Sequence, residues 1–279
     1  MNKHFHHLIP CFVLFSLVAC GGSPPPATPT ASPTPTVVPT AFSTPTAIPT
    51  TFSTPTTSLI NSPLSQSVTL TSYLFSSGNS PEYTITAQTP ALTGSNDPRV
   101  IKFNHEMYAL VQGLMNEFSV NLKDLPADPM LTKSFQDISF KLVSPPGNIY
   151  SLKFGIMVYV EGAAHPNTYS RTVTYDLEKG EDVILAQLFL PGVDYLSPIS
   201  EYCLSQLNAS PIGPALYAEG AQPTLENYRN WNISADGLVV TFDAYQVAAY
   251  AAGPQIVTIP YTALAGIIDP NRPLSIYLQ

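Results

Sequence analysis

The sequence predicts an α+β fold that combines antiparallel sheets with two main helices. Alternating apolar and polar residues between Ile149 and Asp182 indicate a long hairpin of two strands. Apolar residues spaced three and four apart indicate one helix after Asp97 and a second helix from about Asp194 to Asn208. Because strands dominate and do not alternate regularly with helices, we expect no βαβ units.

Residues 1–20 have the pattern of a bacterial lipoprotein signal peptide. Lys3 precedes an apolar run, from Leu8 to Ala19, that is too short to span a bilayer. The run ends at Leu17-Val18-Ala19-Cys20, which resembles the lipobox, where the signal is cut before a lipidated cysteine. Cys20 is therefore the predicted lipidation site. The alternative is an ordinary secretory signal with an incidental cysteine.

Residues 21–66 follow as a linker that consists almost entirely of Pro, Thr, Ser and Ala. Such a composition cannot bury enough apolar surface to fold, so we expect a disordered tether. Its prolines favour an extended chain that could reach on the order of 100 Å. The anchor and the tether together predict an extracytoplasmic protein that is lipid-anchored to a bacterial membrane.

The folded part is predicted as two segments, 67–145 and 146–279. In the first segment, strands at 68–75 and 82–91 precede a helix that Asp97 caps and Pro98 begins. A further strand at 135–143 ends at a turn over 145–148. The helix places His105 and Glu106 on its solvent side, and its apolar stripe consists of Val100, Phe103, Met107, Leu110, Leu114 and Phe118.

The second segment begins with the hairpin 149–182, whose strands flank the loop Glu161–Asn167. The next helix carries Cys203 on its apolar face, which indicates a buried small residue rather than a nucleophile. With Cys11 removed in the signal and Cys20 acylated, Cys203 is the only remaining thiol, and no intramolecular disulfide is expected. A long loop at 209–228, a hairpin of 228–234 and 237–242, and short strands at 257–261 and 274–278 around a brief helix complete the prediction.

The charge balance excludes some classes of partner. The chain has nineteen acidic and eleven basic residues and a net charge of −8. This balance argues against nucleic acid and against direct adsorption to anionic lipid, so the lipid anchor is the only membrane contact expected. It suits a cationic partner, although many acidic domains are acidic only for solubility.

The residue inventory permits few kinds of catalysis. Outside the signal segment the chain has two histidines, His105 and His165, so we expect neither a multi-histidine nor a cysteine-rich metal site, and no cofactor. The serine-hydrolase elbow and the common phosphate-binding glycine loops are absent. A carboxylate pair using residues such as Glu161 or Asp176 is the enzymatic route left open. We leave an enzyme open and favour a non-catalytic role.

The hairpin loop is the predicted recognition element. His165, next to Pro166, is either a recognition residue or a structural residue whose ring bonds loop carbonyls and fixes the turn. Aromatic residues further along the chain are expected to join it. The candidate ligand-binding residues are Tyr159, Glu161, His165, Asn167, Tyr169, Tyr245 and Tyr250.

These residues also carry a resemblance to a known family. The strings Tyr159–Asn167, with Gly162-Ala163-Ala164-His165-Pro166 inside it, Tyr175-Asp176-Leu177, Phe242–Gly253 and Ile259-Pro260-Tyr261 resemble the RsiV-type C-terminal domain, the extracytoplasmic domain of the anti-sigma-V factor. The resemblance covers about residues 146–265. Residues 68–143 resemble the small domain that precedes it in PdaC-like peptidoglycan deacetylases.

The resemblance implies an α+β fold with β-grasp-like features and, as a ligand, the cationic protein lysozyme. We see neither a sigma-binding segment nor a deacetylase domain with metal-binding histidines, so we expect neither sigma-factor signalling nor deacetylation. The predicted function is that of a surface-anchored bacterial lipoprotein that binds a protein such as lysozyme or a cell-wall glycan. The alternatives are a carboxylate-dependent cell-wall hydrolase or esterase and a passive envelope module.

Overall fold

A computed structural model of the protein describes residues 64–79, 83–123, 134–145 and 147–271. The predicted signal with Cys20, the predicted linker up to residue 63 and the predicted strand at 274–278 lie outside the described residues. All described residues belong to one compact unit, Thr57–Gln279. Among them, no helix is both long and apolar enough to cross a membrane.

The larger sheet has six strands in the order β1-β2-β3-β4-β5-β6. It contains strands from both predicted segments, because β3 pairs with β4 across the turn at 143–148. Its strands are β1 (Thr69–Asn79), β2 (Tyr83–Thr93), β3 (Ser134–Leu142), β4 (Ile149–Tyr159), β5 (Asn167–Asp176) and β6 (Glu181–Asp182). The predicted hairpin of 149–182 is therefore confirmed as β4 and β5, in an antiparallel register that pairs Ile156 with Tyr169.

One pair of strands departs from the predicted antiparallel arrangement. β2 and β3 run parallel, with Tyr83 opposite Ser134. They are joined by the long helix α1 (Pro98–Lys123), which returns the chain to the end of the sheet at which β2 began. The expectation of antiparallel sheets without a βαβ unit was wrong here. That expectation relied on the absence of a regular alternation of strands and helices, and a single helix between two strands does not produce such an alternation.

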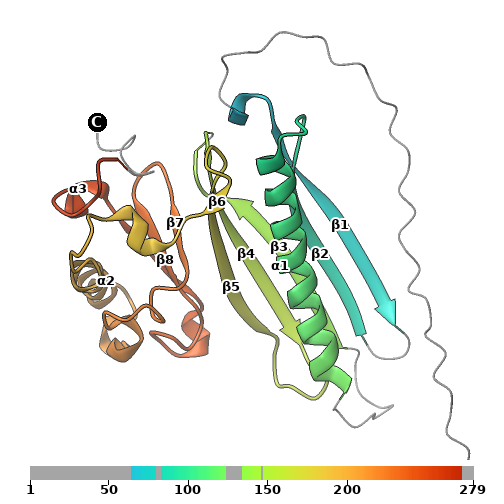
Figure 1. Cartoon of the computed structure of the whole chain (residues 1–279). Coiled ribbons are helices and arrows are strands. Elements are labelled where there is room, and N and C mark those ends of the chain that lie inside the picture. Colours follow the sequence, from blue (N-terminus) through green and yellow to red (C-terminus); the bar gives the residue numbers. More distant parts are fainter. Residues whose placement is uncertain (1–63, 80–82, 124–133, 146, 272–279) are drawn as a thin grey trace, which may run out of the picture. The chain divides into compact units, whose positions relative to one another are not determined.

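Helix α1 covers one face of this sheet (Figure 1). Asp97 caps it as predicted, since its carboxylate accepts a hydrogen bond from the Arg99 N–H at 2.8 Å. The buried face of α1 differs from the predicted stripe. Val111 and Met115 are buried, whereas Leu110 and Leu114, which were predicted to be in the stripe, are half-buried. The helix and the sheet bury one hydrophobic core, whose largest members include Phe103, Phe154 and Tyr175.

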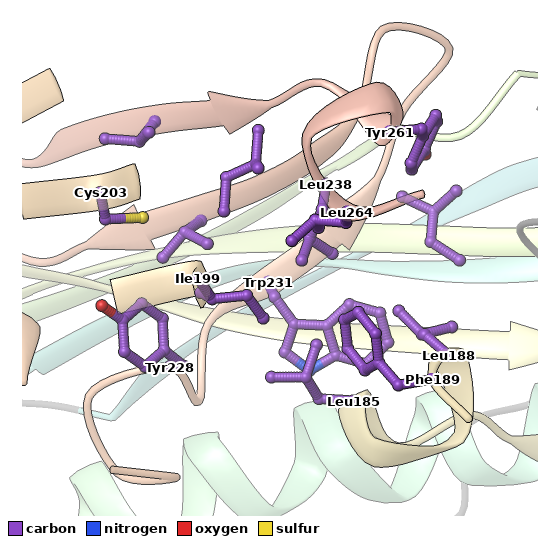
Figure 2. Packing of buried hydrophobic residues seen from close by; sticks show 14 of the residues in the cluster. Leu185, Leu188, Phe189, Ile199, Cys203, Tyr228, Trp231, Leu238, Tyr261 and Leu264 are labelled. Atoms are coloured by element: carbon purple, nitrogen blue, oxygen red, sulfur yellow. The ribbon is translucent and has the colours of Figure 1, made fainter. Parts of the chain in front are cut away.

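The smaller sheet consists of β7 (Trp231–Ile233), β8 (Leu238–Phe242) and β9 (Gln255–Ile259), all antiparallel. Around its core lie α2 (Leu196–Ala209), α3 (Tyr261–Leu264) and the 3-10 turn η2 (Leu185–Leu188). Figure 2 shows side chains of this core meeting in one cluster, with Ile199 and Cys203 from α2 and Trp231 from β7. Further 3-10 turns are η1 (Leu64–Gln66), η3 (Gly213–Ala215), η4 (Ala218–Ala221) and η5 (Tyr250–Ala252).

Buried hydrogen bonds join the two sheets. The Asn232 side-chain amide donates to Ser151 Oγ at 2.9 Å, and the Ile233 N–H donates to the same oxygen at 3.0 Å. The Lys153 ammonium donates to Thr241 Oγ1 at 2.9 Å. The second face of β4 is thus partly covered by β7 and β8, although alternation alone predicted a strand with one buried face. The α+β class is confirmed by the mixture of two sheets and three α-helices among the described residues.

Candidate functional site

Three of the candidate residues form one aromatic cluster. It lies where the loop between β4 and β5 meets the segment after β8. The His165 ring stacks on the Tyr250 ring with centroids 3.9 Å apart and planes inclined by 20°. The Tyr245 ring is 5.4 Å from the Tyr250 ring at 33°. We call His165, Tyr245 and Tyr250 the aromatic cluster.

One carbonyl holds the stacked pair in place. The Tyr250 hydroxyl donates to the Pro166 carbonyl at 2.7 Å, and His165 Nδ1 lies 3.0 Å from the same oxygen. Because a carbonyl only accepts, Nδ1 carries the hydrogen in that bond. Gly162 makes the loop turn possible with a φ of +87°. The His165 ring therefore bonds a loop carbonyl, as in the structural interpretation, and the residue is exposed.

Tyr245 is held toward solvent by a strained turn. It is the one described non-glycine residue with positive φ, at 69°, and 57 % of its surface is exposed. An L residue in this conformation costs on the order of 1 kcal/mol, and such strain is common at functional positions. The next residue, Gln246, anchors the turn by donating to the carbonyls of Gly220 at 3.0 Å and Asn227 at 2.9 Å.

The other candidate residues have different surroundings. Tyr159 is half-buried against Phe135 on β3, with centroids 5.7 Å apart. The Glu161 N–H donates to Ser134 Oγ at 2.9 Å, and Asn167 is exposed at the start of β5. Tyr169 packs against the core under α1, and burial raises its pKa. The structure therefore brings His165 together with Tyr245 and Tyr250 and leaves these four outside the cluster.

The candidate carboxylate Asp176 has a structural role. It is buried, and its Oδ1 accepts hydrogen bonds from the N–H groups of Glu178 at 3.0 Å and Lys179 at 3.2 Å. These bonds close the turn between β5 and β6, so the carboxylate is not available to an open site. No cluster of three His, Cys, Asp or Glu residues suited to a metal occurs in the part of the chain that the structure describes.

A groove beside β5 was not predicted from the sequence. Its volume is about 470 Å³, and it lies between α1, β5 and the segment 225–231. Glu106 and Asp182 line it together with Arg171, Arg229 and Trp231. Glu106, predicted on the solvent side of α1, is half-buried in its wall, whereas His105 is exposed as expected. These residues are distant in sequence, and only the packing of α1 over β5 brings them together.

The two carboxylates of this groove influence each other. Burial and the nearby charge of Glu106 raise the pKa of Asp182, and Lys102 opposes this shift. Glu106 Oε1 lies 3.4 Å from the Lys102 ammonium. Glu106 Oε2 is shielded from solvent without a hydrogen-bond partner among the described residues. Negative charge at this end of the groove is therefore only partly compensated.

A family model matches the part of the chain that contains two residues of the aromatic cluster. Residues 186–262 match a family model described as "Protein of unknown function (DUF3298)". The matched range contains α2, the smaller sheet and both tyrosines of the aromatic cluster. It does not include His165 or the β5 groove wall formed by α1.

A curated relative is named as a peptidoglycan deacetylase. Over 157 residues the chain is 27% identical to the peptidoglycan-N-acetylmuramic acid deacetylase PdaC of Bacillus subtilis (strain 168). The match covers 55% of this chain and 33% of the deacetylase, so the chain spans about one third of that relative's length. The resemblance to the RsiV-type domain stays a prediction.

One of two similar solved structures supports the fold. A DUF3298 family member from Bacteroides fragilis NCTC 9343 superposes with a TM-score of 0.54 at 15% identity, covering 76% of this chain and 97% of that one. A DUF3298 family protein from Pseudomonas aeruginosa PAO1 gives a TM-score of 0.49 at 15% identity over 73% and 94% of the two chains. The first likeness shows the α+β architecture alone.

Proposed function

We propose that the protein is a binding module of the bacterial cell envelope that holds peptidoglycan glycan on the aromatic cluster. The observation that carries this proposal is the rigidly held arrangement of the exposed His165 and Tyr245 around the half-buried Tyr250. The relative named as a peptidoglycan deacetylase supports the choice of polymer. The predicted lipid anchor at Cys20 and the linker over 21–66 would present the module outside the membrane.

Glycan suits this surface for a physical reason. A sugar ring has faces of C–H groups that pack on flat aromatic rings, and hydroxyls at its edge that need hydrogen-bond partners. Tyrosine and histidine offer an apolar body with a polar tip, which matches both requirements. Because one carbonyl and a strained turn already fix the rings, little side-chain entropy is lost when a ligand binds.

The test is cosedimentation of residues 57–279, the unit that holds both cores, with insoluble peptidoglycan. Tyr245→Asn keeps a residue that tolerates positive φ and removes the ring. It should weaken binding by about tenfold, because a lost contact of about 1.4 kcal/mol changes a dissociation constant tenfold. Tyr108→Ala is the matched control, since Tyr108 is 55 % exposed on α1, outside the cluster. Equal binding by both variants and the parent would refute the proposal.

Lysozyme is the second candidate ligand, favoured by the net charge of −8 and by the resemblance to the RsiV-type domain. An attraction of this kind should weaken as salt rises, because added ions screen exposed charges. Calorimetric titration with lysozyme at low and moderate salt separates the candidates. Saturable, salt-sensitive binding that is lost in Tyr245→Asn would replace glycan with lysozyme as the ligand of the aromatic cluster.

The hydrolase alternative gains no support from Asp176, because this carboxylate closes a turn. Release of soluble fragments from peptidoglycan, lost in Glu161→Gln, would reinstate it. A passive envelope module would bind neither peptidoglycan nor lysozyme.

A further inference from the structure

The groove beside β5 contains polar groups that the fold leaves without partners, and it lies outside the aromatic cluster. We infer that this groove binds the peptide part of peptidoglycan, a short extended peptide that carries a free ammonium group and a carboxylate. The inference rests on the proposed function and adds a second contact region for the same polymer. It draws on the backbone of β5, the acidic end of the groove and one arginine.

The edge of β5 is open at Thr172, between two positions whose backbone groups are already bonded. The Ser170 N–H points away from β4 and donates to Asp243 Oδ1 at 2.9 Å. The Thr174 carbonyl also points away from β4 and accepts from the Val183 N–H at 2.7 Å. Residues two apart in an antiparallel strand point the same way, so the N–H and C=O of Thr172 face this edge too. Among the described residues, neither group has a partner.

An extended peptide is the ligand that such an edge accepts. Thr172 lines the groove, and β6 is too short to cover this part of β5. A peptide laid beside Thr172 would accept from its N–H and donate to its C=O, which extends the sheet by one short strand. A sugar chain offers no regular backbone donors at this spacing, so the edge favours the peptide part of the polymer.

The acidic end of the groove suits an ammonium group. Glu106 and Asp182 both line this end of the groove, and Asp182 is exposed whereas Glu106 is half-buried. The Lys102 ammonium lies 3.4 Å from Glu106 Oε1 and only partly offsets the raised pKa of Asp182. An ammonium could donate charge-assisted hydrogen bonds to the exposed Asp182 carboxylate, and the nearby negative charge of Glu106 would strengthen the attraction. The peptides of peptidoglycan contain a diamino acid, whose side chain supplies such a group.

Arg171 suits the carboxylate of the same peptide. It is exposed, lines the groove and the adjoining hollow, and takes part in none of the ion pairs found among the described residues. Arg229, by contrast, is held 2.6 Å from Glu226. A guanidinium can bind a carboxylate through two parallel hydrogen bonds. Met107 and Leu110 provide an apolar wall for the methyl groups of alanine residues.

The test compares three probes on residues 57–279 by calorimetric titration. They are disaccharide peptides released from peptidoglycan, the same disaccharide without peptide, and disaccharide peptides whose free amino group is acetylated. We expect the first probe to bind at least about tenfold more tightly than the other two, the worth of one charge-assisted hydrogen bond. The double variant Glu106→Gln and Asp182→Asn should remove this preference, and Arg171→Gln should reduce it.

The controls separate this inference from the proposed function. Glu201→Gln removes an exposed carboxylate of α2 outside the groove and should leave the preference unchanged. If disaccharides with and without peptide bind equally, and the double variant binds like the parent, the groove assignment is wrong while glycan binding stands. If acetylation has no effect, the ammonium contact is wrong. If no probe binds and peptidoglycan is not retained, the inference and the proposed function both fail.

Discussion

Ser151 satisfies every hydrogen bond that its hydroxyl can make. It has no exposed surface, its oxygen accepts from Asn232 and from the Ile233 N–H, and it lies 2.8 Å from Thr174 Oγ1. Because a serine oxygen has two acceptor sites and one hydrogen, its hydrogen is left for Thr174. This one residue therefore ties β4 and β5 to β7.

Replacing Ser151 with alanine should lower the free energy of unfolding by about 2 kcal/mol, since buried donors left without partners cost about 1–3 kcal/mol. Urea unfolding of the parent and of the variant Ser151→Ala measures the difference. Ser205→Ala, an exposed position of α2, is the control and should change little. Equal midpoints for all three proteins would show that the network does not stabilise the fold.

The Cys203 thiol should be unreactive in the folded protein. It is fully buried, and burial raises its pKa to about 12. The folded state thus favours the neutral thiol. The contribution of this preference to the free energy of unfolding is fully present below the pKa of the thiol in the unfolded chain, about 8.5. It is lost as pH rises from there toward 12.

Residues 57–279 contain Cys203 as their only cysteine, so a thiol reagent reports on it alone. At mildly alkaline pH we expect labelling of the native protein to be far slower than labelling in urea, because reaction requires unfolding. Rapid labelling without denaturant would mean that the thiol is accessible. The buried position predicted from the apolar face of the helix would then be incorrect.

At the scale of elements, the segment that carries Tyr245 and Tyr250 depends on a close backbone approach. A Cβ atom on Gly220 would overlap the carbonyl of Gln246, whose side chain in turn bonds the Gly220 carbonyl. Gly220→Ala should therefore push the turn of Tyr245 away from η4. We expect both a lower unfolding free energy, by about 1–3 kcal/mol for an overpacked position, and weaker peptidoglycan binding.

Gly113 provides the control for this substitution. It lies in α1, and nothing lies within 4 Å of a Cβ placed there. Gly113→Ala should raise the unfolding free energy by about 0.5–1 kcal/mol, because alanine loses less backbone entropy in a helix. The two variants together, followed by thermal unfolding, separate a tight contact from a general effect of removing glycine. A Gly220→Ala protein as stable as the parent would contradict the proposed contact.

Local patterns identified most elements and failed where the arrangement is non-local. Alternation located β4 and β5, and Asp97 with Pro98 located the start of α1. The parallel pairing of β2 with β3 could not be predicted from local sequence, because it depends on the end of the sheet to which α1 returns the chain. The groove was missed for the same reason, since Glu106, Arg171 and Asp182 come from three elements. Nothing in the local sequence shows that their side chains meet.

The same contrast holds for the candidate site. Exposed aromatic residues and a histidine beside a proline were recognisable by type, and the fold places His165, Tyr245 and Tyr250 together. The sequence could not show that the Tyr250 hydroxyl would bond the Pro166 carbonyl, or that Tyr169 would pack against the core. Residue type indicates what a side chain can do, and the tertiary contacts decide whether it is available.

At the scale of the whole molecule, the two hydrophobic cores share β4. Leu152 and Phe154 on one face pack under α1, whereas Ser151 on the other face bonds β7. The sequence boundary predicted between residues 145 and 146 passes just before this strand. A fragment of 146–279 would retain β4 but lose α1, and it would expose buried side chains, each worth about 1.5–3 kcal/mol.

We therefore expect residues 57–279 to unfold in one transition and 146–279 to show no cooperative unfolding. Trp231, the only tryptophan, reports on the smaller core, and far-UV circular dichroism reports largely on α1 in the other. Coincident urea transitions by the two probes would establish one cooperative unit, because independent cores would melt separately. If the tryptophan transition occurs at a different urea concentration, or if 146–279 folds alone, the bonds between the sheets do not couple the cores. Ligand contacts at the aromatic cluster and at the β5 groove would then act on separately folding parts.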